Sequence, residues 1–125
     1  MPVSGISARE STKTFAWDDD LVSDSMYYIH SRAPLEPLLV TDVVERTNLS
    51  HSGFKKRFIR TVGHSPKSEI KRVRKEHLKM LLRTTTLTIH TLAERMRFSS
   101  TEELSRFFLR EVGTTPSNYR KNPVG

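Results

Sequence analysis

An internal repeat limits what this chain can fold into more than any other feature of its sequence. The first copy runs from Val43-Val44-Glu45-Arg46 to Gly63-x-x-Pro66, and the second runs from Leu92-Ala93-Glu94-Arg95 to Gly113-x-x-Pro116, with one extra residue. Repeated segments of this length predict repeated supersecondary units. The chain is therefore expected to form one unit, a connecting segment and a second unit.

The connecting segment, residues 65–83, is predicted to be a very basic amphipathic helix. Ser65 offers a side-chain oxygen as N-cap, and Pro66 fits the first turn, where no backbone N–H is needed. The apolar positions recur at helical spacing and the basic ones fill the other sides. The expected apolar face is Ile70, Val73, His77 and Met80/Leu81, and the basic residues are Lys67, Lys71, Arg72, Lys75 and Lys79.

The first unit is predicted to be a helix-turn-helix preceded by a supporting helix from about Asp18 to His30. The helix-turn-helix is expected to open with a helix over residues 41–47. A tight turn follows at Asn48, a residue that tolerates the left-handed conformation. Ser50 is the expected N-cap of the next helix. That helix places Phe54, Phe58 and Val62 four residues apart, so they are expected to face the core.

The second unit is predicted to repeat this arrangement. Thr88 is expected to cap its first helix, Arg97 lies at the turn, and Ser100 with Glu103 has the pattern of a capping box. Leu104, Phe108 and Val112 repeat the inward spacing, and Thr115-Pro116 opens a short last helix. The predicted core aromatic residues of the two units are Phe54, Phe58, Phe98 and Phe108.

The expected fold class is all-α, with two helix-turn-helix subdomains joined by a central connecting helix and about seven helices in all. The predicted segments are a flexible N-terminal tail or interdomain linker 1–17, a first subdomain 18–64, the connecting helix 65–83, a second subdomain 84–121 and a tail 122–125.

Positive charge is concentrated in the middle of the chain. Between Ser50 and Arg83 there are 11 Lys and Arg residues against two acids, Glu69 and Glu76, whereas the whole chain has a formal net charge of +7. This concentration favours a polyanion partner, because neutralised phosphates release counterions. A solvated basic surface, an anionic membrane surface and an acidic protein partner remain alternatives at this point.

Several classes of protein are excluded by what the sequence lacks. It has no cysteine, no apolar run near the roughly 18 residues of a membrane span, and no apolar signal-peptide core. It also has no glycine-rich phosphate loop, nucleophile elbow or metal motif, so neither an enzyme nor a cofactor is expected. The histidines, for which structural roles are expected, are His30, His51, His64, His77 and His90.

The second unit carries a family signature. The run Leu92-Ala93-Glu94 … Phe98-Ser99-Ser100 … Leu104-Ser105-Arg106-Phe107-Phe108 … Gly113 to Arg120 resembles that of the arabinose-regulator (AraC) family of bacterial transcription regulators. The resemblance extends over about residues 21–120. It implies sequence-specific binding of double-stranded DNA, with two helices reading successive major grooves. The family commonly has glycine where Arg97 stands, which implies a left-handed turn there.

A shorter resemblance lies upstream. Arg9-Glu10-Ser11-Thr12 followed by Asp18-Asp19-Asp20 is similar to the linker of xylose-operon regulators in the family, where a sugar-sensing domain comes first. It implies a role in xylose-like sugar catabolism, with the sugar effector bound by a sensor domain absent from this chain. RNA polymerase is the implied partner if the protein activates transcription. The implied location is the cytoplasm, at the nucleoid.

The resemblance also implies DNA contacts. The implied base-reading residues are Ser52, Lys55 and Lys56 in the first unit and Thr101, Glu102, Ser105 and Arg106 in the second. The expected phosphate-binding residues are Ser50, Arg60, Lys67, Ser100, Thr115 and Arg120.

Three of these assignments leave alternatives open. Glu102 equally serves the dipole of its helix, and Lys55 and Lys56 suit phosphates as well as bases. The rival to the whole interpretation is a nonspecific basic helical module that binds RNA or an acidic protein.

Overall fold

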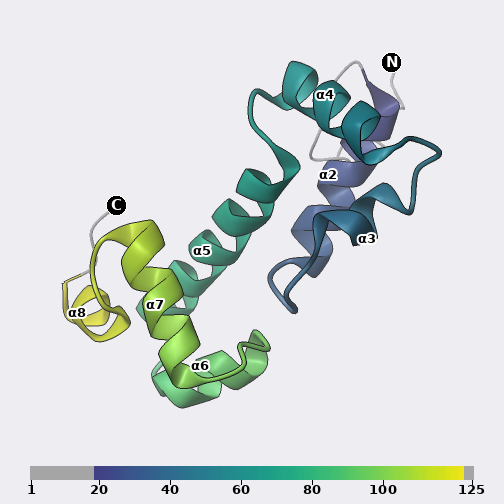
Figure 1. Ribbon diagram of the computed structural model, residues 1–125. Coiled ribbons are helices and arrows are strands. Elements are labelled where there is room, and N and C mark those ends of the chain that lie inside the picture. The colour runs from purple at the N-terminus through teal and green to yellow at the C-terminus, as the bar shows by residue number, and fades with distance from the viewer. Residues whose placement is uncertain (1–18, 123–125) are drawn as a thin grey trace, which may run out of the picture. The chain divides into compact units, whose positions relative to one another are not determined.

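A computed structural model of the chain describes residues 19–122. All regular structure within them is helical, which confirms the predicted all-α class (Figure 1). The helices are α2 (Asp20–Arg32), α3 (Val40–Val44), α4 (His51–Val62), α5 (Pro66–Thr84), α6 (Ile89–Arg95), α7 (Thr101–Val112) and α8 (Pro116–Lys121). The predicted tail 1–17 lies outside the described residues, as do Asp18 and residues 123–125, so of the residues that carry the linker resemblance only Asp19 and Asp20 are described.

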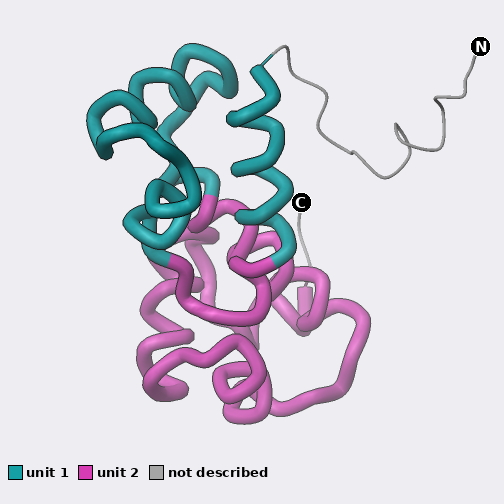
Figure 2. Tube along the Cα trace, turned by 90° about the vertical axis from the view of Figure 1, so that its right-hand side faces the viewer, with its two compact units in different colours: residues 1–31, 39–69 teal, residues 32–38, 70–125 magenta. Residues whose placement is uncertain are grey.

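The chain divides into two compact units, coloured separately in Figure 2. Among the described residues, unit 1 comprises 19–31 and 39–69, and unit 2 comprises 32–38 and 70–122. Helix α5 therefore contributes its first turn to unit 1 and the rest to unit 2. The predicted domain boundaries made this helix a separate segment. In the structure, by contrast, each part of the helix belongs to one of the two units.

Unit 1 packs α2, α3 and α4 around two phenylalanine rings. Phe54 and Phe58 are fully buried, as predicted, with ring centroids 5.7 Å apart. Val62, the third residue of the predicted inward row, is only partly buried. The remaining apolar core of the unit is Val22, Met26, Ile29, Val43 and Val44.

Asp19 ties the start of α2 to α4. Its carboxylate accepts hydrogen bonds from the backbone N–H groups of Leu21 at 3.1 Å and Val22 at 3.2 Å. It also accepts from Arg57, at 2.5 Å from Nε and 3.0 Å from Nη2. The Arg57 hydrogen bond is the main reason why the pKa of Asp19 lies below its usual value, and the two backbone bonds act in the same direction.

The turn between α3 and α4 differs from the prediction. Asn48 is not left-handed, because Arg97 is the only non-glycine residue with positive φ among residues 19–122. The Thr47 hydroxyl instead donates to Val44 O at 2.7 Å and accepts from Leu49 N at 3.1 Å. Since a side chain closes this turn, no residue needs a positive φ.

Unit 2 packs α6, α7 and α8 against α5. The Phe108 and Tyr119 rings meet edge to face, with centroids 5.4 Å apart. Phe98 was predicted to be a core residue. It packs against the same cluster but is only partly buried, so it contributes less to the core than Phe108 does. The buried cluster is Leu78, Leu82, Leu92, Ala93, Met96, Leu104, Phe108 and Tyr119.

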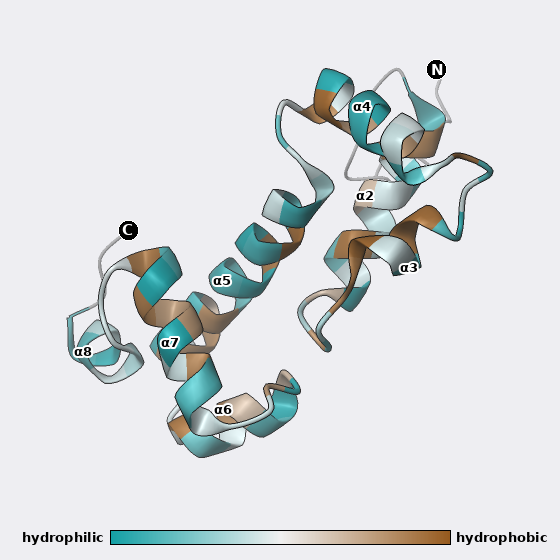
Figure 3. Ribbon diagram, viewed as in Figure 1, coloured by the Kyte–Doolittle hydropathy of each residue, from teal (hydrophilic) through white to brown (hydrophobic). Residues whose placement is uncertain are grey.

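The predicted apolar face of α5 is correct in its first half and partly correct in its second, where Leu81 packs against the buried cluster. Ile70 and Val73 are buried as predicted, but Met80 is 37% exposed. Leu78 and Leu82, four residues apart, are buried instead. Met80 lies about 200° around the helix from Leu78, because each residue turns the helix by about 100°. Figure 3 shows the resulting division of α5 into a hydrophobic and a hydrophilic side.

Every predicted N-cap of the repeat forms. Ser50, Ser65, Thr88, Ser100 and Thr115 each accept a hydrogen bond from the backbone N–H three residues later, at 3.0–3.2 Å. These bonds satisfy helix N–H groups that have no partner within the helix. Helices α4 and α7 therefore start with the same local chemistry, whereas α3 starts after Leu39 without a side-chain cap.

The capping box at α7 forms with a shifted partner. Glu103 Oε1 accepts from Ser99 N at 2.6 Å and from Ser99 Oγ at 2.8 Å, rather than from Ser100 N. These two hydrogen bonds hold the pKa of Glu103 below its usual value, the backbone bond most strongly. One half of the predicted capping box forms, since Ser100 accepts from the Glu103 N–H. In the other half, Ser99 takes the place of Ser100 as the partner of the Glu103 carboxylate.

The turn between α6 and α7 is left-handed at Arg97, as the family resemblance implies. Arg97 has φ 60°. The Phe98 N–H donates to Ala93 O at 2.8 Å, and the Arg97 N–H donates to Glu94 O at 3.2 Å. These bonds are those of a Schellman motif, which most often places glycine at this position.

Candidate nucleic-acid interface

The outer face of α4 carries the residues predicted to read bases in unit 1. Burial of Phe54 and Phe58 turns the opposite side of the helix to solvent. Ser52, Lys55 and Lys56 are exposed on that side. Two ammonium groups and a hydroxyl therefore lie on the first two turns of one helix face.

Helix α7 presents the equivalent face in unit 2. Its residues correspond to those of α4 with an offset of 50, so Glu102, Ser105 and Arg106 match Ser52, Lys55 and Lys56. Glu102 and Arg106 are exposed, whereas Thr101 and Ser105 are partly exposed. The two faces share their geometry but differ in chemistry, because one is basic and the other combines an acid, a hydroxyl and a guanidinium.

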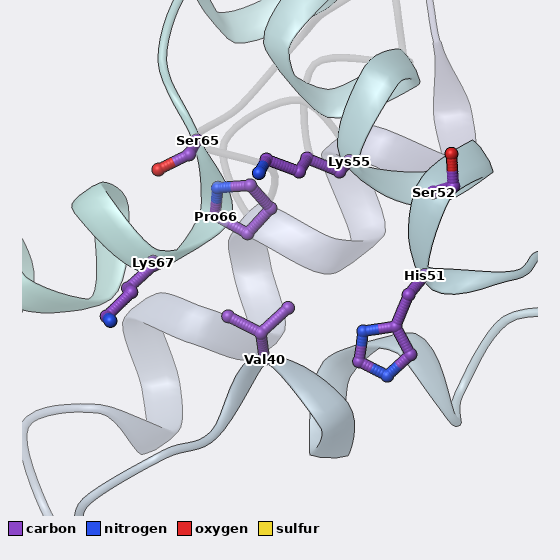
Figure 4. Close-up of a pocket in the computed structure, with 7 residues that line it drawn as sticks. All are labelled: Val40, His51, Ser52, Lys55, Ser65, Pro66 and Lys67. Carbon is purple, nitrogen blue, oxygen red and sulfur yellow. The ribbon is translucent and has the colours of Figure 1, made fainter.

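A cavity of about 540 Å³ in unit 1 brings together residues from both predicted sets (Figure 4). Ser52 and Lys55 come from α4, and Lys67 comes from the first turn of α5. Ser65, the N-cap of α5, also lies at the cavity, and His51 and Val40 complete one side of it. Base-reading and phosphate-binding candidates are thus neighbours on this unit.

The other phosphate candidates of unit 1 are also accessible. Arg60 and Ser50 are exposed, although the Ser50 hydroxyl already caps α4. In unit 2, Ser100 and Thr115 likewise act as caps. Hydroxyls that accept a helix N–H retain a donor hydrogen for a phosphate oxygen.

Arg120 has a role that the sequence did not suggest. Its guanidinium donates to Leu82 O at 3.1 Å, Leu87 O at 2.6 Å and Thr85 O at 3.2 Å. These bonds attach α8 to the end of α5 and to the segment before α6. The three bonds use three of the five guanidinium N–H groups, so Arg120 has a structural role, and its predicted phosphate contact stays a prediction.

Arg74 is a second basic residue with an unexpected position. It is 6% exposed, and it donates to Ala33 O at 2.7 Å and to Met96 O at 2.8 Å. Its guanidinium lies 4.7 Å from the centroid of the Phe98 ring. Burial lowers the pKa of Arg74, and the negative charge of Glu103 opposes this shift. Arg74 is therefore removed from the surface that attracts a polyanion.

Two exposed apolar residues on the outer faces were also missed. Ile59 on α4 is 38% exposed and Leu109 on α7 is 50% exposed. They occupy equivalent positions in the repeat, so comparing the two copies residue by residue would have found them.

The structure offers no metal site among residues 19–122, since no group of three or more possible ligands is found there. Over the same residues, no helix is both long and apolar enough to span a membrane.

Comparison with known proteins identifies the family. Residues 43–122 match the model of a family described as a helix-turn-helix domain. The chain is 28% identical over 120 residues to the xylose operon regulatory protein of Escherichia coli K12, covering 96% of this chain and 30% of that protein. It is 31% identical over 106 residues to a putative AraC-like transcription regulator of Streptomyces lividans, covering 85% and 34%. The chain thus spans about a third of the length of these relatives.

A solved structure supports the same assignment. The C-terminal domain of AraT, a response regulator from Geobacillus stearothermophilus, superposes with a TM-score of 0.77 at 25% identity, covering 86% of this chain and 88% of that one. The family model, the two relatives and the solved structure all indicate the same family. None of these relatives is named as an enzyme. The chain belongs to the helix-turn-helix family of AraC-type DNA-binding domains of transcription regulators.

Proposed function

We propose that this chain binds double-stranded DNA at a specific sequence, with α4 and α7 each placed in a major groove. The observation that carries the proposal is the repeat itself. Two helices with the same N-cap, the same inward phenylalanine and the same exposed outer face occur once in each unit. Helix-turn-helix proteins read bases with such a helix, and two of them suit grooves about 34 Å apart.

The differing chemistry of the two faces predicts an asymmetric site. Arg106 suits bidentate pairing with the O6 and N7 atoms of guanine, and Glu102 suits the amino group of cytosine. Lys55 and Lys56 suit guanine or the phosphates beside it. Lys67 and Arg60 are assigned to phosphates, because they are exposed and flank the reading face of unit 1. Ser50, Ser100 and Thr115 add weaker phosphate contacts at helix N-termini.

The biological role is proposed from the relatives. The likeness to the Escherichia coli xylose operon regulatory protein supports control of sugar catabolism. In this proposal a sugar effector acts through a sensor domain outside this chain, and RNA polymerase is the partner if binding activates transcription. The proposed place of action is the cytoplasm, at the nucleoid.

Selection of bound duplexes from a random library tests the proposal. We expect one asymmetric sequence to be enriched and to remain preferred when the salt concentration is raised, because base contacts depend less on salt than phosphate contacts do. Single-stranded DNA and RNA serve as competitors. Equal affinity for every nucleic acid would instead support a nonspecific basic module.

A pair of arginine variants then separates the two kinds of contact. Arg106→Ala should reduce discrimination at one base pair by about 1–3 kcal/mol, whereas Arg60→Ala should weaken binding to all sequences alike. The measurement is the dissociation constant for the selected duplex and for its single-base variants at two salt concentrations. Identical effects of the two substitutions would contradict the assigned roles.

A further inference from the structure

We propose that Ile59 and Leu109 are specificity-determining residues that contact thymine methyl groups in the major groove. The inference rests on the proposed function, because it assigns a base contact to residues of the same two helices. It adds an apolar contact to two faces for which only polar contacts were predicted.

Both residues lie on the outer face of their helix, toward its C-terminal half. Ile59 follows Ser52, Lys55 and Lys56 by seven, four and three residues. These are the spacings at which side chains share one helix face. Leu109 follows Glu102, Ser105 and Arg106 by the same numbers of residues. Each apolar side chain therefore continues the row of predicted base-reading residues by one turn.

Core packing does not explain these residues. Ile59 is 38% exposed and Leu109 is 50% exposed, whereas the adjacent residues Phe58 and Phe108 are fully buried. Helix propensity does not explain Ile59, since a β-branched residue is a poorer helix former than alanine or lysine. A single exposed apolar side chain needs no explanation. The same exposure at equivalent positions of two otherwise different faces is a second, independent observation.

The chemistry of the major groove indicates the ligand. Among the four bases, only thymine presents an apolar group there, its C5 methyl, and aliphatic side chains contact it. The other residues of the two faces have hydroxyl, ammonium, carboxylate or guanidinium groups, which suit polar base edges. Ile59 and Leu109 would thus add the ability to distinguish thymine from cytosine at one position in each half of the site.

Deoxyuridine provides a direct probe, because it pairs like thymidine and lacks only the methyl group. The full chain is used, and each thymine of the selected duplex is replaced in turn by deoxyuridine. We expect affinity to fall about fourfold at one thymine in each half of the site, as for the loss of one buried methyl group. The readout is the dissociation constant from fluorescence anisotropy at fixed salt.

The variants assign each methyl group to its side chain. Ile59→Ala should abolish the effect of deoxyuridine in one half of the site, and Leu109→Ala should abolish it in the other half. Met80→Ala is the matched control, because Met80 is 37% exposed and lies on neither helix. It should leave both effects unchanged. Circular dichroism melting checks that the variants fold, which is expected since alanine favours helices.

The outcomes separate this inference from the proposed function. Sequence-specific binding that is insensitive to deoxyuridine at every position would overturn the inference and leave the proposed function intact. The inference is likewise overturned if Ile59→Ala and Leu109→Ala retain the full sensitivity of the unchanged chain. If no duplex is enriched in the selection, both fail together.

Discussion

Each unit buries one charged residue of α5, but the groups that contact this residue differ between the two units. In unit 1 the Glu69 carboxylate is 0% exposed, and its oxygens lie 2.6 Å from His30 Nε2 and 2.5 Å from His64 Nε2. In unit 2 the nearly buried Arg74 guanidinium donates to the carbonyls of Ala33 and Met96. The acid is thus held by side chains and the base by the main chain.

This difference determines whether the hydrogen-bond partners of each buried charge depend on the identity of other side chains. A carboxylate needs donors, and unit 1 provides two of them as imidazoles from separate segments. A guanidinium needs acceptors, and backbone carbonyls supply them whatever side chain their residue carries. The Glu69 contacts described above therefore depend on the identities of His30 and His64, whereas the carbonyl contacts of Arg74 do not depend on the side chains of Ala33 and Met96. Substitutions of the two α5 residues test this comparison.

The largest effect is expected for Arg74→Ala. The substitution leaves the carbonyls of Ala33 and Met96 buried without their donor, at about 1–3 kcal/mol each. We expect the free energy of unfolding to fall by about 3–4 kcal/mol. Urea denaturation measures the loss, and amide hydrogen exchange should place it in α6 and α7.

The control for this variant is Arg95→Ala, which removes an exposed arginine from the same unit. Its effect should stay below about 0.5 kcal/mol. If both variants lose the same stability, the carbonyl contacts of Arg74 contribute nothing beyond a surface charge.

A smaller effect is expected for Glu69→Gln, which keeps the shape of the side chain and removes its charge. Hydrogen bonds to a charged group contribute about 1.5–3 kcal/mol, so a loss of about 2 kcal/mol is expected. Hydrogen exchange should now increase in α2 and α4, because these helices and the Glu69 partners His30 and His64 belong to unit 1.

Glu76→Gln is the matched control on the same helix. Glu76 is exposed, and its carboxylate lies 3.5 Å from the Nζ atom of the partly buried Lys79, so removing its charge is expected to cost little. Exchange that rises equally in both units after Glu69→Gln would show that the carboxylate does not stabilise unit 1 in particular.

What the sequence predicted correctly depends on neighbours in the chain. The caps at Ser50 and Ser100 follow from a side chain and an N–H three residues apart, and the exposure of Lys56 follows from the burial of Phe58 on the same helix. In the sequence, Glu69 is one of two acids in a basic segment, and its burial was not predicted. Its partner His30 is 39 residues away, and no local pattern indicates that pairing.

The same reasoning explains why the sequence did not indicate the structural partners of two arginines. Arg120 has the composition of a phosphate ligand, but its acceptor Leu82 O is 38 residues away. Arg74 contacts Ala33 O across 41 residues. Charge therefore predicted the class of partner, whereas the availability of each cation required the tertiary structure.

The turns of the two helix-turn-helix units repeat the contrast on a smaller scale. The first turn is closed by the Thr47 side chain, and the second is closed by backbone bonds around the left-handed Arg97. Only the second turn forces an L-residue into a strained conformation. The two turns should therefore respond oppositely to glycine.

Arg97→Gly should raise the free energy of unfolding by about 1 kcal/mol, because glycine adopts positive φ without the clash that other residues meet. Asn48→Gly is the matched substitution in the first turn and should give no gain, since Asn48 has no positive φ and glycine adds entropy to the unfolded chain. Thermal melting of the two variants beside the unchanged chain measures both.

A rise in melting temperature for Asn48→Gly as large as that for Arg97→Gly would mean that backbone strain does not distinguish the turns. A rise for Arg97→Gly alone would show that arginine is tolerated at this position at a cost in stability.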